Sequence, residues 1–95
     1  MITERCLKIS GRVQRVGFRF WVTRLAHSIG DISGYVCNLP DGDVLVLISG
    51  VADKIDKMHL KLYTGPLFAR VDKIIETPEL KNFFPPIENN VFKRI

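Results

Sequence analysis

Apolar and polar residues alternate along the first part of the chain and then change to a helical period. Over positions 5–13 the period is two, which predicts a half-buried strand. From Val22 to Ile29 apolar residues recur three and four positions apart, as on one face of an amphipathic helix. Gly30 follows and predicts the end of this helix, because glycine readily takes the positive φ common after a last helical turn.

Two further strands are predicted over positions 32–38 and 43–49. The turn between them, Leu-Pro-Asp-Gly at 39–42, combines a proline that restricts φ with a glycine that accepts a positive φ. This turn predicts an antiparallel hairpin. Residues 44–48 are all apolar, which indicates a central strand covered on both faces.

The second half of the chain repeats the change from helix to strand. A second amphipathic helix is predicted to end at Gly65-Pro66, and a fourth strand over 68–76. The apolar face of the helix is formed by Val51, Ile55, Met58 and Leu62. In the strand, Ala69, Val71 and Lys73 alternate with Arg70, Asp72 and Ile74. Three prolines make 77–90 an irregular segment, in which Phe83 and Phe84 are expected to cover an edge of the core, and 91–95 is a short final strand.

The order of these elements is β-α-β-β-α-β, followed by a fifth short strand. It predicts an α+β fold of the ferredoxin-like type, in which two helices cover one face of an antiparallel sheet. We interpret residues 1–95 as a single domain. Cys6 and Cys37 fall on strands that a third strand separates by about 10 Å, so both thiols are expected to be free.

Composition narrows the possible functions only a little. The formal net charge of +4 would attract small anions as well as nucleic acid, so it does not distinguish between these ligands. No apolar run reaches the roughly 20 residues that span a bilayer, and no signal-peptide pattern is present, so we expect a cytoplasmic protein. Two cysteines and two histidines lack the spacing of metal ligands, so no metal site is expected.

The segment between the first strand and the first helix is the one with unusual chemistry. Its backbone amides precede a helix N-terminus, where unpaired N–H groups and the helix dipole favour anions. Arg12, Arg15 and Arg19 lie in or beside it. These features predict an anion-binding loop, although an ordinary connection with solvated arginines has the same composition. The segment has neither the Gly-Lys-Ser/Thr of a P-loop nor the glycine spacing of a dinucleotide-binding loop.

Three motifs in order resemble the acylphosphatase family. Residues 11–19, Gly-Arg-Val-Gln-Arg-Val-Gly-Phe-Arg, resemble the family signature Gly-x-Val-Gln-Gly-Val-x-Phe-Arg. Residues 34–42, Gly-Tyr-Val-Cys-Asn-Leu-Pro-Asp-Gly, are similar to a second signature with asparagine at its centre. Residues 65–71 are similar to the family's Gly-Pro-x-x-Ala-x-Val. The resemblance covers nearly the whole chain.

The resemblance implies hydrolysis of the carboxyl–phosphate bond of small acyl phosphates, without metal or cofactor. By position, Arg19 corresponds to the family's catalytic arginine and Asn38 to its water-positioning asparagine. The loop amides that would hold the phosphoryl oxygens belong to Gln14, Arg15, Val16, Gly17 and Phe18. We expect a monomer whose partner is this small substrate, with no membrane or nucleic acid involved. Asp41 is interpreted as a turn residue.

The chain departs from the family pattern at Arg15, where glycine is usual. If that backbone needs a positive φ, a side chain costs about 1 kcal/mol or more. The Arg15 side chain could point outward, distort the loop whose amides would hold the phosphoryl group, or add a cationic contact for the substrate. The alternatives to an enzyme are a ferredoxin-like module that binds RNA or another anion, and a degenerate phosphate binder. A related domain also occurs within the larger hydrogenase maturation factors. One extra residue between Gly30 and Gly34 predicts a longer bend or a bulge.

Overall fold

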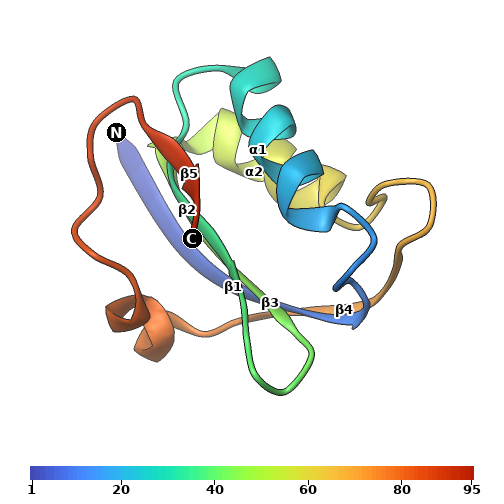
Figure 1. The fold of residues 1–95 in the computed structure, drawn as a ribbon. Helices are drawn as coiled ribbons and strands as arrows, with labels where there is room; N and C mark the ends of the chain where they lie inside the picture. Colours follow the sequence, from blue (N-terminus) through green and yellow to red (C-terminus); the bar gives the residue numbers. More distant parts are fainter.

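A computed structural model describes all 95 residues. It contains five strands, two α-helices and one 3-10 helix (Figure 1). In chain order the elements are β1 (Ile2–Arg12), α1 (Phe18–Ile29), β2 (Ser33–Asn38), β3 (Val44–Val51), α2 (Ala52–Lys61), β4 (Arg70–Glu76), η1 (Pro78–Phe83) and β5 (Phe92–Arg94). Neither α-helix is long and apolar enough to cross a membrane.

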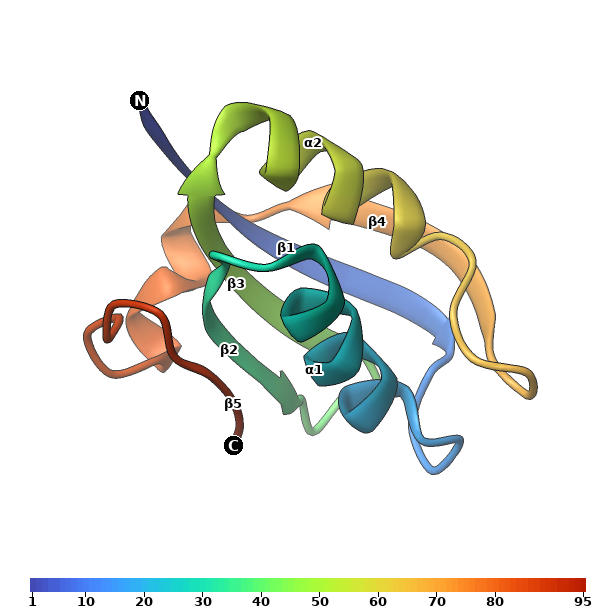
Figure 2. The same cartoon turned by 90° about the horizontal axis from the view of Figure 1, so that it is seen from above.

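The strands form one sheet in the order β4-β1-β3-β2-β5. The pairs among the first four are antiparallel, and β5 pairs in parallel with β2. Both α-helices lie over the same face of the sheet (Figure 2). The predicted α+β ferredoxin-like architecture is therefore confirmed, and the structure adds the parallel direction of the last strand. Cys6 and Cys37 lie on strands either side of β3 and are free, as predicted.

The central strand β3 divides two hydrophobic clusters. Val44, Val46 and Ile48 are fully buried on the helix side, in a cluster with Val22, Ala26, Ile55, Met58 and Leu62. Leu45 and Leu47 are buried on the opposite side. This double burial explains why 44–48 contains no polar residue, since the side chains of these five residues all face apolar surroundings.

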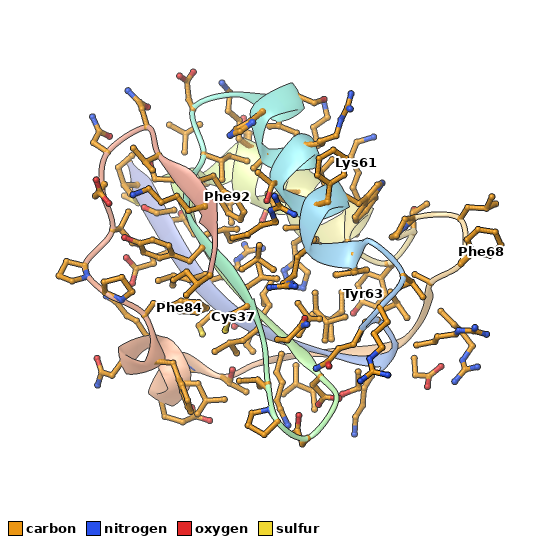
Figure 3. The ribbon with its side chains drawn as sticks, viewed as in Figure 1. Cys37, Lys61, Tyr63, Phe68, Phe84 and Phe92 are labelled. Carbon is orange, nitrogen blue, oxygen red and sulfur yellow. The ribbon has the colours of Figure 1, made fainter.

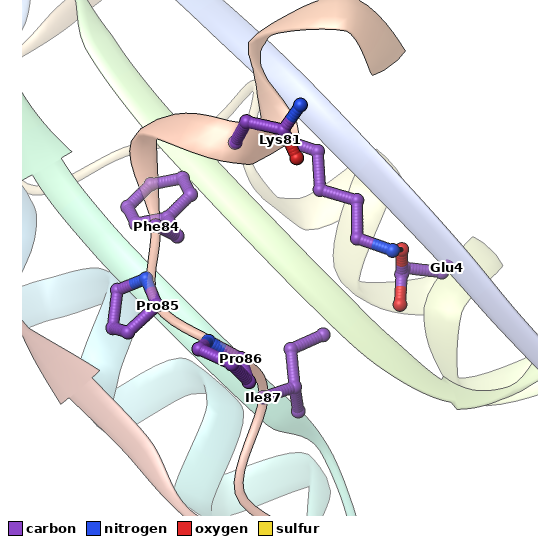
Figure 4. A pocket seen from close by; sticks show the side chains of 7 residues that line it. Glu4, Lys81, Phe84, Pro85, Pro86 and Ile87 are labelled. Atoms are coloured by element: carbon purple, nitrogen blue, oxygen red, sulfur yellow. Dashed lines mark ion pairs between the residues drawn. The ribbon is translucent and has the colours of Figure 1, made fainter.

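The helix-free face of the sheet is covered by the segment between β4 and β5. The ring of Phe84 stacks on that of Tyr35, with centroids 5.6 Å apart, and the Tyr35 hydroxyl donates to the Pro86 carbonyl at 2.7 Å. Figure 3 shows Phe84 and Cys37 on this side of the sheet. Phe84 is 8% exposed but Phe83 is 64% exposed, so the expectation that both phenylalanines cover the core holds only for Phe84. A shallow pocket remains between this segment and β1, where Lys81 pairs with Glu4 (Figure 4).

Two details of the predicted pattern are wrong. Val51 does not belong to the second helix face: it is the last residue of β3 and is 42% exposed, and the helix ends at Lys61 rather than near Gly65. The expected alternation along β4 is also broken, because Val71 and Ile74 both pack against the helix-side core. The register of β4 against β1 shifts by one residue, leaving Asp72 as an extra residue in a bulge.

Candidate active site

The loop between β1 and α1 has the backbone shape of an anion nest. Gly17 precedes the first helical residue with a φ of 77°, and Arg15 has a φ of 61°. The first hydrogen bond of the helix runs from the Trp21 amide to the Gly17 carbonyl, 3.0 Å long. The amides of residues 14–18 donate to no group of the protein. Five consecutive N–H groups before and at a helix N-terminus are therefore available to an anion.

The start of this loop depends on a close approach between two strands. A Cβ atom on Gly11 would lie 2.1 Å from the Arg70 carbonyl oxygen of β4. The bulge in β4 begins at the same point, between the partners of Ser10 and Gly11. Glycine at this position therefore lets the edge strand pack against the end of β1, immediately before the loop turns toward α1.

Side chains of β1 and the loop hold the β2–β3 hairpin in place. Gln14 Nε2 donates to the Leu39 carbonyl at 2.8 Å and to the Asp43 carbonyl at 2.9 Å. On β1, Lys8 Nζ pairs with the Asp41 carboxylate at 2.8 Å, and Ser10 donates to Asp43 at 2.8 Å. Asn38 ends β2 directly before this turn. These contacts fix Asn38 beside the loop, although Asn38 follows Gln14 by more than 20 residues along the chain.

The Asp41 carboxylate serves the turn, as its position in the sequence predicts. Its Oδ1 accepts a hydrogen bond from the Asp43 amide at 3.0 Å, and the turn closes with a 3.2 Å bond from the Gly42 amide to the Leu39 carbonyl. The hydrogen bond that Lys8 donates to Asp41 lowers the pKa of Asp41 and raises the pKa of Lys8. Asp41 is thus engaged in the hairpin and does not line the pocket described next.

A pocket of about 110 Å³ opens where the loop, the end of β2 and β5 meet. It brings Arg19 and Asn38 together with Arg15, Gly17 and Phe18. The complete lining is Val13, Arg15, Gly17, Phe18, Arg19, Phe20, Asn38 and Arg94. Of the predicted site residues, Gln14 and Val16 are absent from this lining: Gln14 turns its side chain to the hairpin, and Val16 packs against the core.

The electrostatics of the pocket are strongly cationic. The sequence from Arg5 to Gly30 contains six basic residues and no aspartate or glutamate. Arg15, Arg19 and Arg94 all line the pocket, and none of them forms an ion pair with an aspartate or glutamate. Arg19 Nη1 donates only to the main-chain oxygen of Ile95, the last residue of the sequence, at 3.2 Å. Burial raises the pKa of the neighbouring Cys37 thiol, with a smaller opposing effect from Arg19.

Arg12 is not part of this arrangement, although it lies beside the loop in sequence. It is exposed, pairs in register with Arg70 on the edge strand and does not line the pocket. The structure therefore separates Arg12 from Arg15 and Arg19, which sequence position alone grouped together.

Three lining residues were missed by the sequence analysis: Val13, Phe20 and Arg94. Phe20 follows Arg19 in the first turn of α1, and Arg94 comes from β5, which pairs with β2. The Arg94 guanidinium lies 5.6 Å from the centroid of the Phe20 ring. The only sequence signal for Arg94 was a basic residue in the last strand. To place that residue at the pocket, one has to know that β5 pairs with β2.

The structure contains no group of three or more His, Cys, Asp or Glu residues placed as metal ligands would be.

The fold and this pocket define a small ferredoxin-like α+β protein whose cationic pocket lies at the start of its first helix. The sequence model of the Acylphosphatase family matches residues 6–84. An acylphosphatase of Nitrobacter winogradskyi is 42% identical over 78 residues, which are 82% of this chain and 78% of that protein. The chain belongs to the acylphosphatase family, and it is an enzyme of that family.

Solved structures agree with this assignment. The crystal structure of acylphosphatase from Bacillus subtilis superposes with a TM-score of 0.80 at 27% identity, covering 100% of this chain and 99% of that one. The HypF protein of T. kodakarensis contains a similar unit, with a TM-score of 0.76 and 31% identity, but the match covers only 12% of its chain. The matched acylphosphatases thus share the extent of this chain, whereas HypF is far larger.

Proposed function

We propose that this protein hydrolyses small acyl phosphates by direct attack of a water molecule on phosphorus. The observation that supports this most strongly is the meeting of Arg19 and Asn38 in one pocket, beside five backbone amides that have no protein partner. Family membership supports the same reaction class. One domain, residues 1–95, would carry the whole site.

The phosphoryl group would be held by the loop amides and by Arg19. A doubly charged phosphoryl group needs several donors aimed at its oxygens, and the unpaired amides of residues 14–18 supply them. The Arg19 guanidinium can donate two parallel hydrogen bonds to such a group. These donors are fixed before the substrate arrives, so their stabilisation of developing charge costs little reorganisation.

Asn38 would position the attacking water. Its carboxamide both accepts and donates hydrogen bonds, and no protein group occupies either function. Attack forms a new P–O bond and breaks the bond between phosphorus and the acyl oxygen, in line with it. The products are a carboxylate and inorganic phosphate. The carboxylate is a stable leaving group, and the water proton passes to a phosphoryl oxygen, so no general acid or base is required from the protein.

Arg15 would add positive charge at the mouth of the same pocket. It adopts a left-handed conformation, which glycine accepts most readily, at the position where the family signature has glycine. Because Arg15 is exposed and lines the pocket, its charge is available to the substrate. We therefore favour a catalytically active phosphate-binding loop over a degenerate phosphate binder.

Nucleic-acid binding is the less supported alternative. RNA-recognition modules of this fold stack bases on aromatic side chains of the open sheet face. Here that face is covered by the 77–91 segment, and its aromatic residue Tyr35 is 2% exposed and stacks on Phe84. An oligonucleotide would have to displace this segment before it could reach the sheet.

The test is hydrolysis of benzoyl phosphate by the wild type and by Arg19→Ala and Asn38→Ala, in the presence and absence of EDTA. We expect turnover that EDTA leaves unchanged and that falls by about 100-fold or more in both variants. Arg12→Ala and Asn82→Ala are the matched controls, since neither residue lines the pocket. Phosphate binding by a wild type that does not turn over benzoyl phosphate would contradict the proposal, as would full activity in Arg19→Ala.

A further inference from the structure

Part of the pocket lining has no role in the proposed reaction. Arg19, Asn38 and the loop amides account for the phosphoryl group and the water. Phe20 and Arg94 line the same pocket from two other positions, the first turn of α1 and the last strand. The acyl group attached to a bound phosphate must extend past other residues of the lining. Phe20 and Arg94 are therefore candidates for contact with that acyl group.

Arg94 is held in place without being neutralised. Its guanidinium lies 5.6 Å from the centroid of the Phe20 ring, and it forms neither a salt bridge nor a hydrogen bond with the protein. Its neighbour on β5, Lys93, differs in this respect because it pairs with Glu88. A guanidinium that lies over an aromatic ring and has no other partner keeps its N–H groups free for hydrogen bonding.

The free edge of a guanidinium matches the two oxygens of a carboxylate. Phe20 is 52% exposed, so it also offers an apolar surface to a short aliphatic chain. The geometry points to a subsite, formed by Arg94 and Phe20, that selects acyl phosphates with a carboxylate at the far end of the acyl chain. This inference rests on the proposed hydrolysis and specifies which members of the substrate class it favours.

Arg24 provides a comparison within the structure. Its guanidinium lies 5.7 Å from the centroid of the same Phe20 ring, but Arg24 does not line the pocket. Arg24 and Arg94 thus carry the same charge at nearly the same distance from one ring. Only Arg94 should affect the choice between acyl groups if contact with the substrate, rather than general positive charge, determines it.

The experiment compares succinyl phosphate with butyryl phosphate, which have chains of equal length and differ in a terminal carboxylate or methyl group. The measurement is the ratio of their kcat/KM values. We expect the wild type to favour succinyl phosphate by about fivefold or more, as for a hydrogen-bonded ion pair near a surface. Arg94→Gln should bring the ratio close to one, and Arg94→Lys should retain part of it. Arg24→Gln and the distant Lys57→Gln should leave the ratio within about twofold of wild type.

Each result has a definite consequence. The preference should also weaken as salt rises, a measurement on the wild type that does not depend on whether a variant folds. A ratio near one in the wild type, or one that Arg94→Gln does not change, overturns the subsite and leaves the proposed hydrolysis standing. A preference lost in Arg15→Gln but kept in Arg94→Gln also overturns it, because Arg15 lines the same pocket and has no ion pair either. If neither substrate is hydrolysed, the proposed function fails and the subsite fails with it.

Discussion

The Nε2 atom of Gln14 lies 2.8 Å from the carbonyl oxygen of Leu39, the residue that follows Asn38. Gln14 therefore joins the loop between β1 and α1 to the hairpin that carries the proposed water-positioning residue. We predict that Gln14→Met, which keeps the length of the side chain, destabilises the protein by about 1–2 kcal/mol. Because Asn38 would lose its fixed position, kcat/KM for benzoyl phosphate should fall roughly tenfold or more.

Chemical denaturation and steady-state kinetics separate these two effects. Thr23→Val is a suitable control, because it removes a side-chain hydrogen bond, to the Arg19 carbonyl, from a position outside the pocket. Equal activity per folded molecule in Gln14→Met and the wild type would show that the hairpin does not need this contact.

Replacement of Arg15 by glycine should stabilise the protein while weakening substrate binding. The φ of 61° at Arg15 costs a non-glycine residue about 1 kcal/mol, which corresponds to a rise in Tm of roughly 4–8 °C in a domain of this size. The lost charge at the pocket should raise KM a few-fold. Asn90→Gly is the control, since Asn90 has a φ of 60° far from the site and asparagine tolerates this conformation better. A fall in Tm for Arg15→Gly would contradict the strain argument.

Phe84 and Phe83 form a matched pair for the helix-free face of the sheet. We predict that Phe84→Ala costs about 3 kcal/mol, because it removes a buried ring that stacks on Tyr35. Phe83→Ala should change the free energy of unfolding by less than about 0.5 kcal/mol, since that ring is exposed. Urea denaturation of both variants measures the difference. Similar losses in the free energy of unfolding for Phe84→Ala and Phe83→Ala would mean that Phe84 does not cover the helix-free face of the sheet.

His59 should make stability depend on pH. Burial and the charge of Arg5 lower its pKa, outweighing the opposite effects of Glu76 and Asp56. A folded-state pKa below the unfolded value of about 6.5 means that the neutral ring is favoured by folding. The stabilisation is therefore present above pH 6.5 and is lost as pH falls through the lowered pKa.

The comparison of Tm at pH 7.5 and pH 5.5 tests this prediction. His59→Gln should show a smaller fall in Tm toward pH 5.5 than the wild type, and His27→Gln, on an exposed position of α1, should behave as the wild type does. An equal fall in Tm for His59→Gln and the wild type would exclude His59 as a source of the pH dependence.

The regular elements were predictable because local patterns and tertiary packing agree in them. The apolar run at 44–48 is the central strand, and the turn at 39–42 closes the expected hairpin. The errors at Val51 and along β4 have tertiary causes. Val51 continues the strand because it pairs with Ile2, and the bulge at Asp72 follows from the close approach of Gly11 to Arg70.

The lining of the candidate pocket could be predicted only where its residues lie close together along the chain. Arg15, Gly17, Phe18 and Arg19 lie within five consecutive residues, so a loop before a helix indicates them directly. Asn38 required the resemblance to a family, since a polar residue at a strand end is otherwise uninformative. Arg94 could not be found, because its place in the pocket depends on β5 pairing with β2, which no local pattern encodes.

The bulge on β4 also affects how copies of this protein meet. β4 is an edge strand, whose outer backbone groups could pair with a strand of another molecule. Here the extra residue Asp72 interrupts the ladder, and Arg70 and Lys73 place charges beside it. The opposite edge, β5, is only three residues long. Both edges are thus poor templates for intermolecular sheets, which favours a protein that stays dispersed at high concentration.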